Sequence, residues 1–162
     1  MSAASNFLEL EILDHVLRYG NGSLNAGTGD GYQPPSTVYV ALFSGTAATV
    51  LTALESGTSS TSGSGNWGFY EITSASSYVR RSITFAAASA GSSASNATVS
   101  FPVASADYNN TAASGATVTC MALMDNSTGG NVLFYGQLTN SKTVNSGDQF
   151  TISSGNLTVS LA

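Results

Sequence analysis

Charged side chains are scarce in this sequence. They make up 8% of its 162 residues, against about 25% in an average soluble domain. Only 4 residues are Lys or Arg and 9 are Asp or Glu, so the formal net charge is −5 at pH 7. Nucleic-acid binding needs clustered cations to contact phosphates, and the one adjacent pair, Arg80 and Arg81, forms no patch. We therefore expect no nucleic-acid partner.

Cysteines and long apolar runs are missing as well. The single cysteine, Cys120, excludes an internal disulfide and any multi-cysteine metal site. It lies in the apolar stretch 118–124, which favours a buried small side chain over a reactive thiol. No run of 18 apolar residues occurs, so we expect no membrane insertion. The first residues carry acids where a signal peptide would be apolar, so export by that route is not expected.

Residues that could carry catalysis are equally few. The only histidine, His15, lies on the polar face of a predicted helix, without the partner that a general base needs. Asp107, Asp125 and Asp148 lie in or beside turns, where Asp commonly accepts hydrogen bonds from the local backbone. No His or Cys cluster has zinc-ligand spacing, and no acidic loop has the EF-hand pattern. We expect no catalytic residue, no metal site and no cofactor.

Ser, Thr, Asn and Gly take the place of the missing charges. The hydrophobic fraction of 42% is near the globular norm, and a domain of this length buries about 70% of its unfolded surface. We expect one domain over residues 1–162. Its polar surface consists of hydroxyls and amides, which cost less to desolvate than charges. Such a surface is suited to burial against neighbouring proteins.

One amphipathic helix is predicted at about residues 6–19. Asn6 can cap its start and Gly20 can end it. Apolar side chains recur on one stripe at 3.6 residues per turn, with charged side chains opposite. The stripe must dock on the rest of the domain or on a second copy, so we regard this as a candidate assembly helix. Its apolar residues are Leu8, Ile12, Leu13, Val16 and Leu17.

Short β-strands dominate the remainder. Eight of them in succession predict a mainly β fold, an antiparallel β-sandwich or jelly-roll-like domain, with no second helix to serve as a crossover. Two segments rich in Gly or Ser, about 20–35 and 44–66, are predicted to be flexible loops. The last two strands are predicted to form a closing hairpin. The predicted strands are 37–43, 67–73, 78–85, 97–101, 117–124, 131–138, 149–153 and 157–161.

Aromatic residues are the remaining candidates for recognition. Trp67 follows a Ser- and Gly-rich stretch, and with Tyr78 it could lie exposed at a sheet edge. Tyr108 lies in a predicted loop and is a second candidate. We treat these three as candidate surface-recognition aromatics for a glycan or receptor, with ordinary core packing as the favoured alternative.

Several motifs together resemble a known family. They span almost the whole chain and resemble a family of small tailed-bacteriophage virion proteins that are labelled tail-fibre-like. The residues that carry the resemblance are 13–17, 37–43, 71–73, 78–80, 83–85, 99–102, 124–125, 129–136, 138, 142–144 and 146–148.

The resemblance implies a non-enzymatic structural subunit of a virion, assembled in the host cytoplasm. Its partners would be copies of itself and other virion proteins. A tail-fibre or tail-tip component and a capsid decoration (cement) protein both fit, because such proteins have similar size and composition. The alternative is a host-surface glycan-binding module that uses Trp67 and Tyr78.

Overall fold

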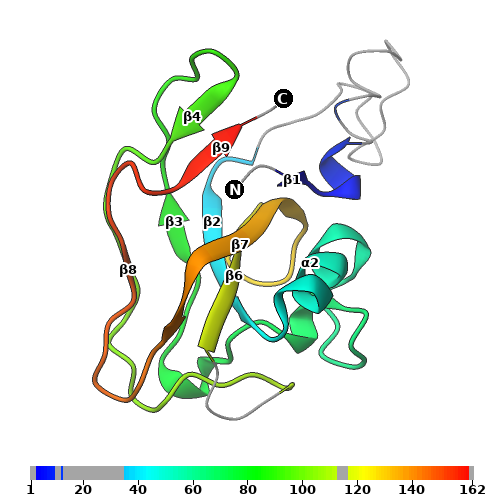
Figure 1. Ribbon diagram of the computed structural model, residues 1–162, viewed down its shortest axis with the longest axis vertical. Helices are drawn as coiled ribbons and strands as arrows, with labels where there is room; N and C mark the ends of the chain where they lie inside the picture. Colours follow the sequence, from blue (N-terminus) through cyan, green and yellow to red (C-terminus); the bar gives the residue numbers. More distant parts are fainter. Residues whose placement is uncertain (1–2, 10–11, 13–34, 113–116, 161–162) are drawn as a thin grey trace.

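The computed structural model describes residues 3–9, 12, 35–112 and 117–160. Its centre is a five-stranded antiparallel sheet in the order β1-β7-β6-β2-β3 (Figure 1), and two smaller antiparallel pairs, β4-β9 and β5-β8, complete the β structure. The predicted mainly β, sandwich-like antiparallel fold is confirmed. The strands are β1 (Ala3–Ala4), β2 (Val38–Ser44), β3 (Arg81–Ile83), β4 (Ser92–Ala94), β5 (Val99–Ser100), β6 (Thr117–Met124), β7 (Val132–Thr143), β8 (Thr151–Ile152) and β9 (Thr158–Ser160).

The interior strand β2 is apolar on both faces because both faces of the sheet are covered. Side chains alternate across a strand, so Val40 and Leu42 enter one core whereas Ala41 and Phe43 enter another. All four are fully buried. The prediction of a central strand at 37–43 is therefore confirmed, with bounds that differ by one residue.

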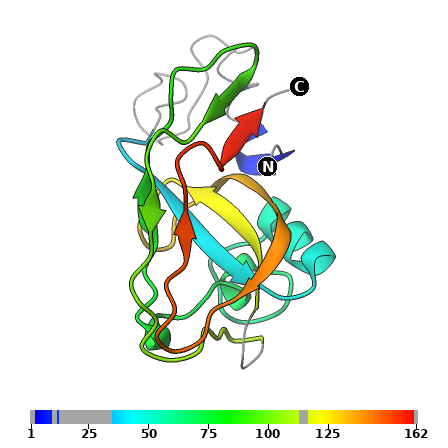
Figure 2. The same ribbon diagram turned by 60° about the vertical axis from the view of Figure 1, so that its left-hand side comes forward.

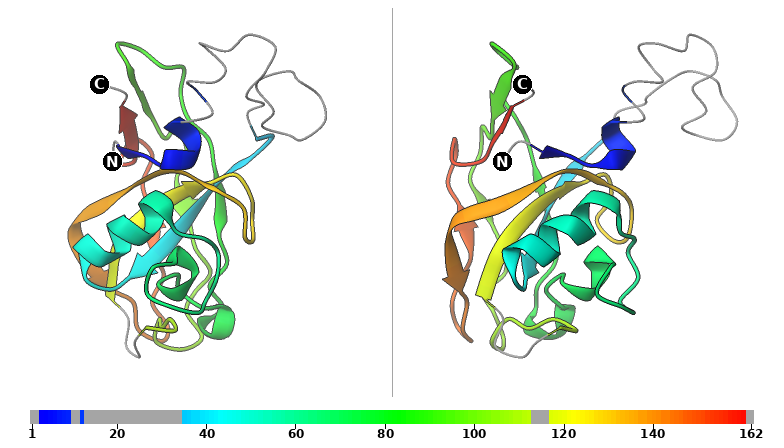
Figure 3. Two further views of the ribbon diagram at one scale, coloured as in Figure 1. Left: turned by 90° about the vertical axis from the view of Figure 1, so that its right-hand side faces the viewer. Right: turned by 45° about the vertical axis from the view of Figure 1, so that its right-hand side comes forward.

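The two cores lie between three layers. One core packs the sheet against the chain segments that contain β5 and β8, and the other packs it against the helix α2 (Ala47–Ser56) and the 3₁₀ turn η1 (Trp67–Phe69). Figure 3 shows α2 across one face of the sheet and β8 on the far side. The first core is aromatic: it includes Tyr78, Phe101, Tyr108 and Phe150.

The segments after residue 96 do not pair as predicted. The strand β8 pairs with β5 and β9 pairs with β4, so 150–152 and 157–161 do not form the expected closing hairpin. The turn-forming residues 153–156 instead carry the chain from one small sheet to the other. Local turn chemistry indicated the turn correctly, but it contains no information on which distant strand each arm meets.

The segment 44–66 also differs from its prediction as a flexible loop. It contains α2, a second helix that the sequence reasoning missed, whose buried residues Val50, Ala53 and Leu54 follow helical spacing. Threonines and the adjoining Ser-rich stretch obscured this short apolar pattern. The predicted strand 67–73 is likewise wrong at its start, where η1 forms, and only Glu71 bridges to Phe43 in a strand-like way.

The N-terminal helix is present, and its described residues are 6–9 and 12. Ser5, rather than Asn6, caps it: the Ser5 hydroxyl accepts a hydrogen bond from the Leu8 N–H at 3.3 Å. The same hydroxyl donates to the Val132 carbonyl, and the Ser5 N–H donates to the Leu133 carbonyl at 3.0 Å. The helix start is therefore fixed to β7. The predicted residues Leu13, Val16 and Leu17, and the loop 20–34, lie outside the described residues.

Beyond the end of the sheet, β4 and β9 form a separate projection. Figure 2 shows it extending past the five-stranded sheet, near the position of the C-terminus. We call residues 84–96 together with 157–160 the β-arm. Its surface residues are Ala, Ser, Thr, Gly and Asn, with no charged side chain.

Candidate functional site

The candidate site lies where β3 ends and leaves one edge of β2 without a strand partner. β3 pairs with β2 only as far as Arg81 opposite Val40. Beyond that point the chain around Glu71 completes the edge: the Ile72 N–H donates to the Leu42 carbonyl at 3.0 Å. This pairing fixes the backbone of Glu71 against the central sheet, and so positions its carboxylate.

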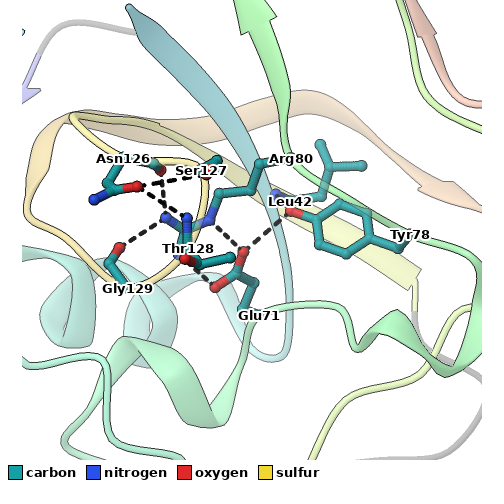
Figure 4. Close-up of polar contacts among 8 residues, drawn as sticks. All are labelled: Leu42, Glu71, Tyr78, Arg80, Asn126, Ser127, Thr128 and Gly129. Atoms are coloured by element: carbon teal, nitrogen blue, oxygen red, sulfur yellow. Dashed lines mark hydrogen bonds and ion pairs between the residues drawn. The ribbon is translucent and has the colours of Figure 1, made fainter.

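Glu71 and Arg80 form a buried ion pair. The Arg80 Nε lies 2.7 Å from Glu71 Oε1, and Arg80 Nη2 lies 2.8 Å from Oε2, so both carboxylate oxygens are engaged (Figure 4). The Arg80 side chain is 3% exposed and that of Glu71 is 16% exposed. A bidentate contact of this kind between an arginine and a carboxylate is among the strongest polar contacts, because two parallel hydrogen bonds form between opposite charges.

The remaining Arg80 donor group holds the turn between β6 and β7. Its Nη1 donates to the Asn126 carbonyl at 2.9 Å and to the Gly129 carbonyl at 2.7 Å. The guanidinium also lies 5.2 Å from the centre of the Trp67 ring, within range of a cation–π contact. One cation thus connects β3, η1 and the β6–β7 turn.

Tyr78 extends this network into the aromatic core. Its hydroxyl donates to Glu71 Oε1 at 3.2 Å and accepts a hydrogen bond from the Leu42 N–H at 3.0 Å (Figure 4). The phenol therefore partners a backbone donor that β3 does not reach. Burial raises the pKa of Tyr78 well above its ordinary value, and the neighbouring Glu71 charge raises it further.

Arg80 remains charged in this surrounding. Burial alone would lower the pKa of Arg80, but its hydrogen bond to Glu71 and the charge of that carboxylate outweigh this effect, so the pKa is raised. A buried charge is tolerated only when it is paired and hydrogen-bonded, which is the case here. The arrangement can hold four segments of chain in a fixed relation.

A surface cleft of about 440 Å³ opens beside the ion pair. Its rim carries the hydroxyls of Ser74, Ser127 and Thr128, together with Val79, which is 49% exposed. Glu71 and Arg80 form part of the lining, but the hydrogen bonds described above direct both toward protein groups. The accessible chemistry of the cleft is therefore that of neutral hydroxyls and one apolar side chain.

The candidate recognition aromatics are buried. Trp67 is 2% exposed, Tyr78 4% and Tyr108 0%, so their interpretation as surface-recognition residues is wrong and ordinary core packing is right. The structure does bring them together: Trp67 and Tyr78 flank the ion pair, and Tyr108 meets Tyr78 edge to face at 6.0 Å between ring centres. Their aromatic rings bury more apolar area inside the fold than they would at a sheet edge.

Tyr108 contrasts with Tyr78 in its polar group. In the part of the chain that the structure describes, its hydroxyl has no hydrogen-bond partner, although the side chain is fully buried. Burial raises the pKa of Tyr108. A buried, unpaired hydroxyl costs free energy that its ring must offset by packing.

Two of the three acidic turn residues act as predicted. Asp125 accepts hydrogen bonds from the Asn131 backbone at 2.7 Å and side chain at 2.9 Å. Asp148 accepts from the Asn145 N–H at 3.0 Å, and Asp107 accepts from the Ser146 N–H at 2.8 Å. The interpretation of Asp125 and Asp148 as residues that stabilise their own turns is confirmed, whereas the partner of Asp107 lies 39 residues away in sequence. Among the described residues, no group of three His, Cys, Asp or Glu lies close enough to hold a metal ion.

Two further predicted positions have separate outcomes. Cys120 is fully buried in the second core, as predicted, and burial raises the pKa of its thiol. His15 lies outside the described residues.

The described part of the predicted assembly helix contacts the chain's own fold. Leu8 is buried in the first core, and Ile12 packs against the same core and is half-buried. No helix in the described part of the chain is long and apolar enough to cross a membrane.

The ion pair itself was missed as a site by the sequence reasoning. A signal was present: charges are rare in this chain, and Arg80 follows the aromatic Tyr78 by two residues and would share its buried face in an extended chain. Nothing in the pattern identified Glu71 as the partner, because their contact depends on how two separate segments align along β2.

Comparison with known proteins was informative at the level of the family. A family model described as Podophage GP4 fiber I protein gp80 matches residues 3–160. No curated protein matched the sequence.

Proposed function

The chain belongs to this podophage fibre family, and from that premise we propose that it is a structural subunit of a phage tail fibre. It works by binding copies of itself and other virion proteins, and not by catalysis. The family match over residues 3–160 is the observation that carries this proposal. A place in the virion, reached after assembly in the host cytoplasm, is part of the same proposal.

The distribution of charge supports a role in assembly. Identical subunits of net charge −5 repel one another wherever their charges meet. Here the surface is mostly hydroxyl and amide, and desolvating those groups costs less than desolvating charges. Subunits with such surfaces can pack closely at low electrostatic cost.

The chemistry of the candidate site supports a non-enzymatic role. Arg80 and Glu71 are the chain's one buried ion pair among the described residues, and their polar atoms contact each other, Tyr78 and backbone carbonyls. General acid–base or electrostatic catalysis requires such groups to face a substrate. These groups instead fix the fold. Trp67 and Tyr78 do not support the glycan-binding alternative, because both are buried.

Locating the protein on intact particles tests the proposal. Antibodies raised against the purified chain and coupled to gold should label the tail appendages in electron micrographs. Particles incubated with an unrelated gold-coupled antibody serve as the control. Label over the capsid would instead indicate a decoration protein, and the absence of label from disrupted and intact particles would contradict a virion role altogether.

A further inference from the structure

The β-arm is an antiparallel ribbon in which β4 pairs with β9 on one side and is bridged by the segment 85–89 on the other. On one side the Ala86 N–H donates to the Ala94 carbonyl at 2.9 Å, and Phe85 bridges to Ser95. On the other side β9 pairs with β4 from Ser92 opposite Ser160 to Ala94 opposite Thr158. The backbone hydrogen-bonding groups of β4 therefore have partners on both sides. β9 forms the outer edge of the ribbon.

In the part of the chain that the structure describes, no strand pairs with the outer edge of β9. The Ser95 N–H donates to the Leu157 carbonyl at 2.8 Å, which directs the backbone of Leu157 toward β4. Backbone polar groups of successive residues alternate between the two edges of a strand, so those of Thr158 and Ser160 face away. In the described residues they have no backbone partner. This edge presents hydrogen-bonding groups that a further strand can satisfy.

Two other strand edges in the molecule, those of β3 and β7, carry features that discourage pairing. Edge strand β3 bears the exposed cation Arg81, and the half of β7 beyond Tyr135 has an irregular register and the exposed Lys142. Charges and bulges are the usual means of protecting edges. Beside β9 there is no charged residue from 82 to 106 or from 149 to 160. The β9 edge lacks this protection.

An apolar groove adjoins the same strand. It has a volume of about 260 Å³ and lies between the β-arm and the end of the central sheet. Val159 lines it from β9, and Phe85 and Phe134 line it from the other elements. An added strand would therefore gain main-chain hydrogen bonds from the edge and apolar burial from the groove, which is the general pattern of β-strand addition.

We propose that the β9 edge, with this groove, is the surface through which a second copy of this chain binds. A second copy is the occupant that the charges favour, because two chains of net charge −5 meet here without opposing any charged residue of the β-arm. The inference rests on the proposed function and adds to it by naming the surface. Strand pairing between copies would place the Thr158 and Ser160 N–H groups in hydrogen bonds.

The test compares two lysine variants of the purified full chain. Thr158→Lys places a cation on the proposed edge, whereas Thr139→Lys places the same charge on the exposed part of β7. Sedimentation velocity should give a wild-type assembly that weakens by about tenfold or more in Thr158→Lys, because a buried cation meets its own copy. Thr139→Lys should sediment like the wild type. Circular dichroism melting should be nearly equal for all three.

A second variant and a second measurement separate the effect of an added charge from the effect of lost strand pairing. Thr158→Pro removes the outward N–H without adding charge, in an edge position that Pro tolerates, and it should weaken association as well. Hydrogen exchange should find the Thr158 amide protected in the wild-type assembly and fast in Thr158→Lys.

Each outcome bears on one of the two proposals. An assembly that persists unchanged in both Thr158 variants, or a freely exchanging Thr158 amide in the assembly, would overturn the β9 interface and leave the structural role intact. A wild-type chain that is present on particles but stays monomeric at all concentrations would also overturn the interface. Absence from particles would defeat the proposed function itself.

Discussion

Two regions of the molecule use charge in opposite ways. Around Arg80, a buried ion pair and the Tyr78 hydroxyl hold β2, β3, η1 and the β6–β7 turn together. In the β-arm, no side chain is charged and one strand edge has no strand partner among the described residues. In a chain with only 8% charged residues, this placement is informative. Charge fixes the fold where loops must be held, and it is absent where neighbours are proposed to meet.

The Arg80 network should be the region most sensitive to substitution. Arg80→Ala leaves the Glu71 carboxylate largely buried without its partner, and breaking a buried pair in this way costs about 3–5 kcal/mol. The free energy of unfolding, measured in urea, should fall by that amount. The matched control is Arg81→Ala, which removes an exposed cation one residue away and should change stability by less than about 0.5 kcal/mol. Equal effects for the two arginines would remove the distinction between the Arg80 network and the rest of the molecule.

Two tyrosines in contact provide a sharper test of the network. Tyr78→Phe leaves the Leu42 N–H without its acceptor and should destabilise by about 1–3 kcal/mol. Tyr108→Phe removes a buried hydroxyl that has no partner among the described residues, so it should be neutral or stabilising. Thermal melting of both variants is the measurement. A loss in Tyr108→Phe as large as that in Tyr78→Phe would contradict the assigned hydrogen bonds.

The loop before Trp67 should also contribute, although less. A Cβ on Gly68 would lie 2.2 Å from the Ser59 carbonyl oxygen, whereas a Cβ on Gly65 would meet no atom within 4 Å. Gly68→Ala should therefore destabilise by about 1–3 kcal/mol, toward the lower end because the loop is exposed and can shift. Gly65→Ala serves as the control and should be nearly neutral. Urea unfolding that ranks the two variants in the reverse order would show that the loop does not pack on η1.

The smallest expected effect concerns pH. Because burial raises the pKa of Cys120 in the folded state, the unfolded chain loses this proton first, near its ordinary pKa of about 8.5. The folded state then holds more protons, and stability falls as the pH rises above that value. Cys120→Ala should reduce this slope by at most about 1.4 kcal/mol per pH unit. Urea unfolding of both proteins at several alkaline pH values measures it, and identical slopes would argue against a buried neutral thiol.

Local patterns predicted some elements well. The strand β6 matches its predicted bounds, because its small and β-branched residues are apolar on both faces. The turn roles of Asp125 and Asp148 were also predictable, since their hydrogen-bond partners lie 6 and 3 residues away in sequence. In these cases the deciding interactions are within a few residues or follow strand periodicity.

Other features depend on contacts between distant segments and could not be predicted. Whether the β8 region pairs with its neighbour or with β5 is decided by the tertiary arrangement, not by the turn between them. Core packing of Trp67 and Tyr78 was the favoured expectation, but nothing in the sequence predicted that both would contact the Arg80–Glu71 ion pair. α2 was missed because only three of its ten residues are buried, which leaves a weak helical signal.

The most direct test of the central claim is the salt dependence of self-association. Sedimentation of the wild-type chain between about 0.05 M and about 1 M NaCl would report it, because salt screens exposed charges. If subunits meet through uncharged surfaces, the assembled fraction should stay constant, or rise as the repulsion between chains of net charge −5 is screened. An assembly that dissociates as salt is added, or no assembly at any salt concentration, would contradict the account.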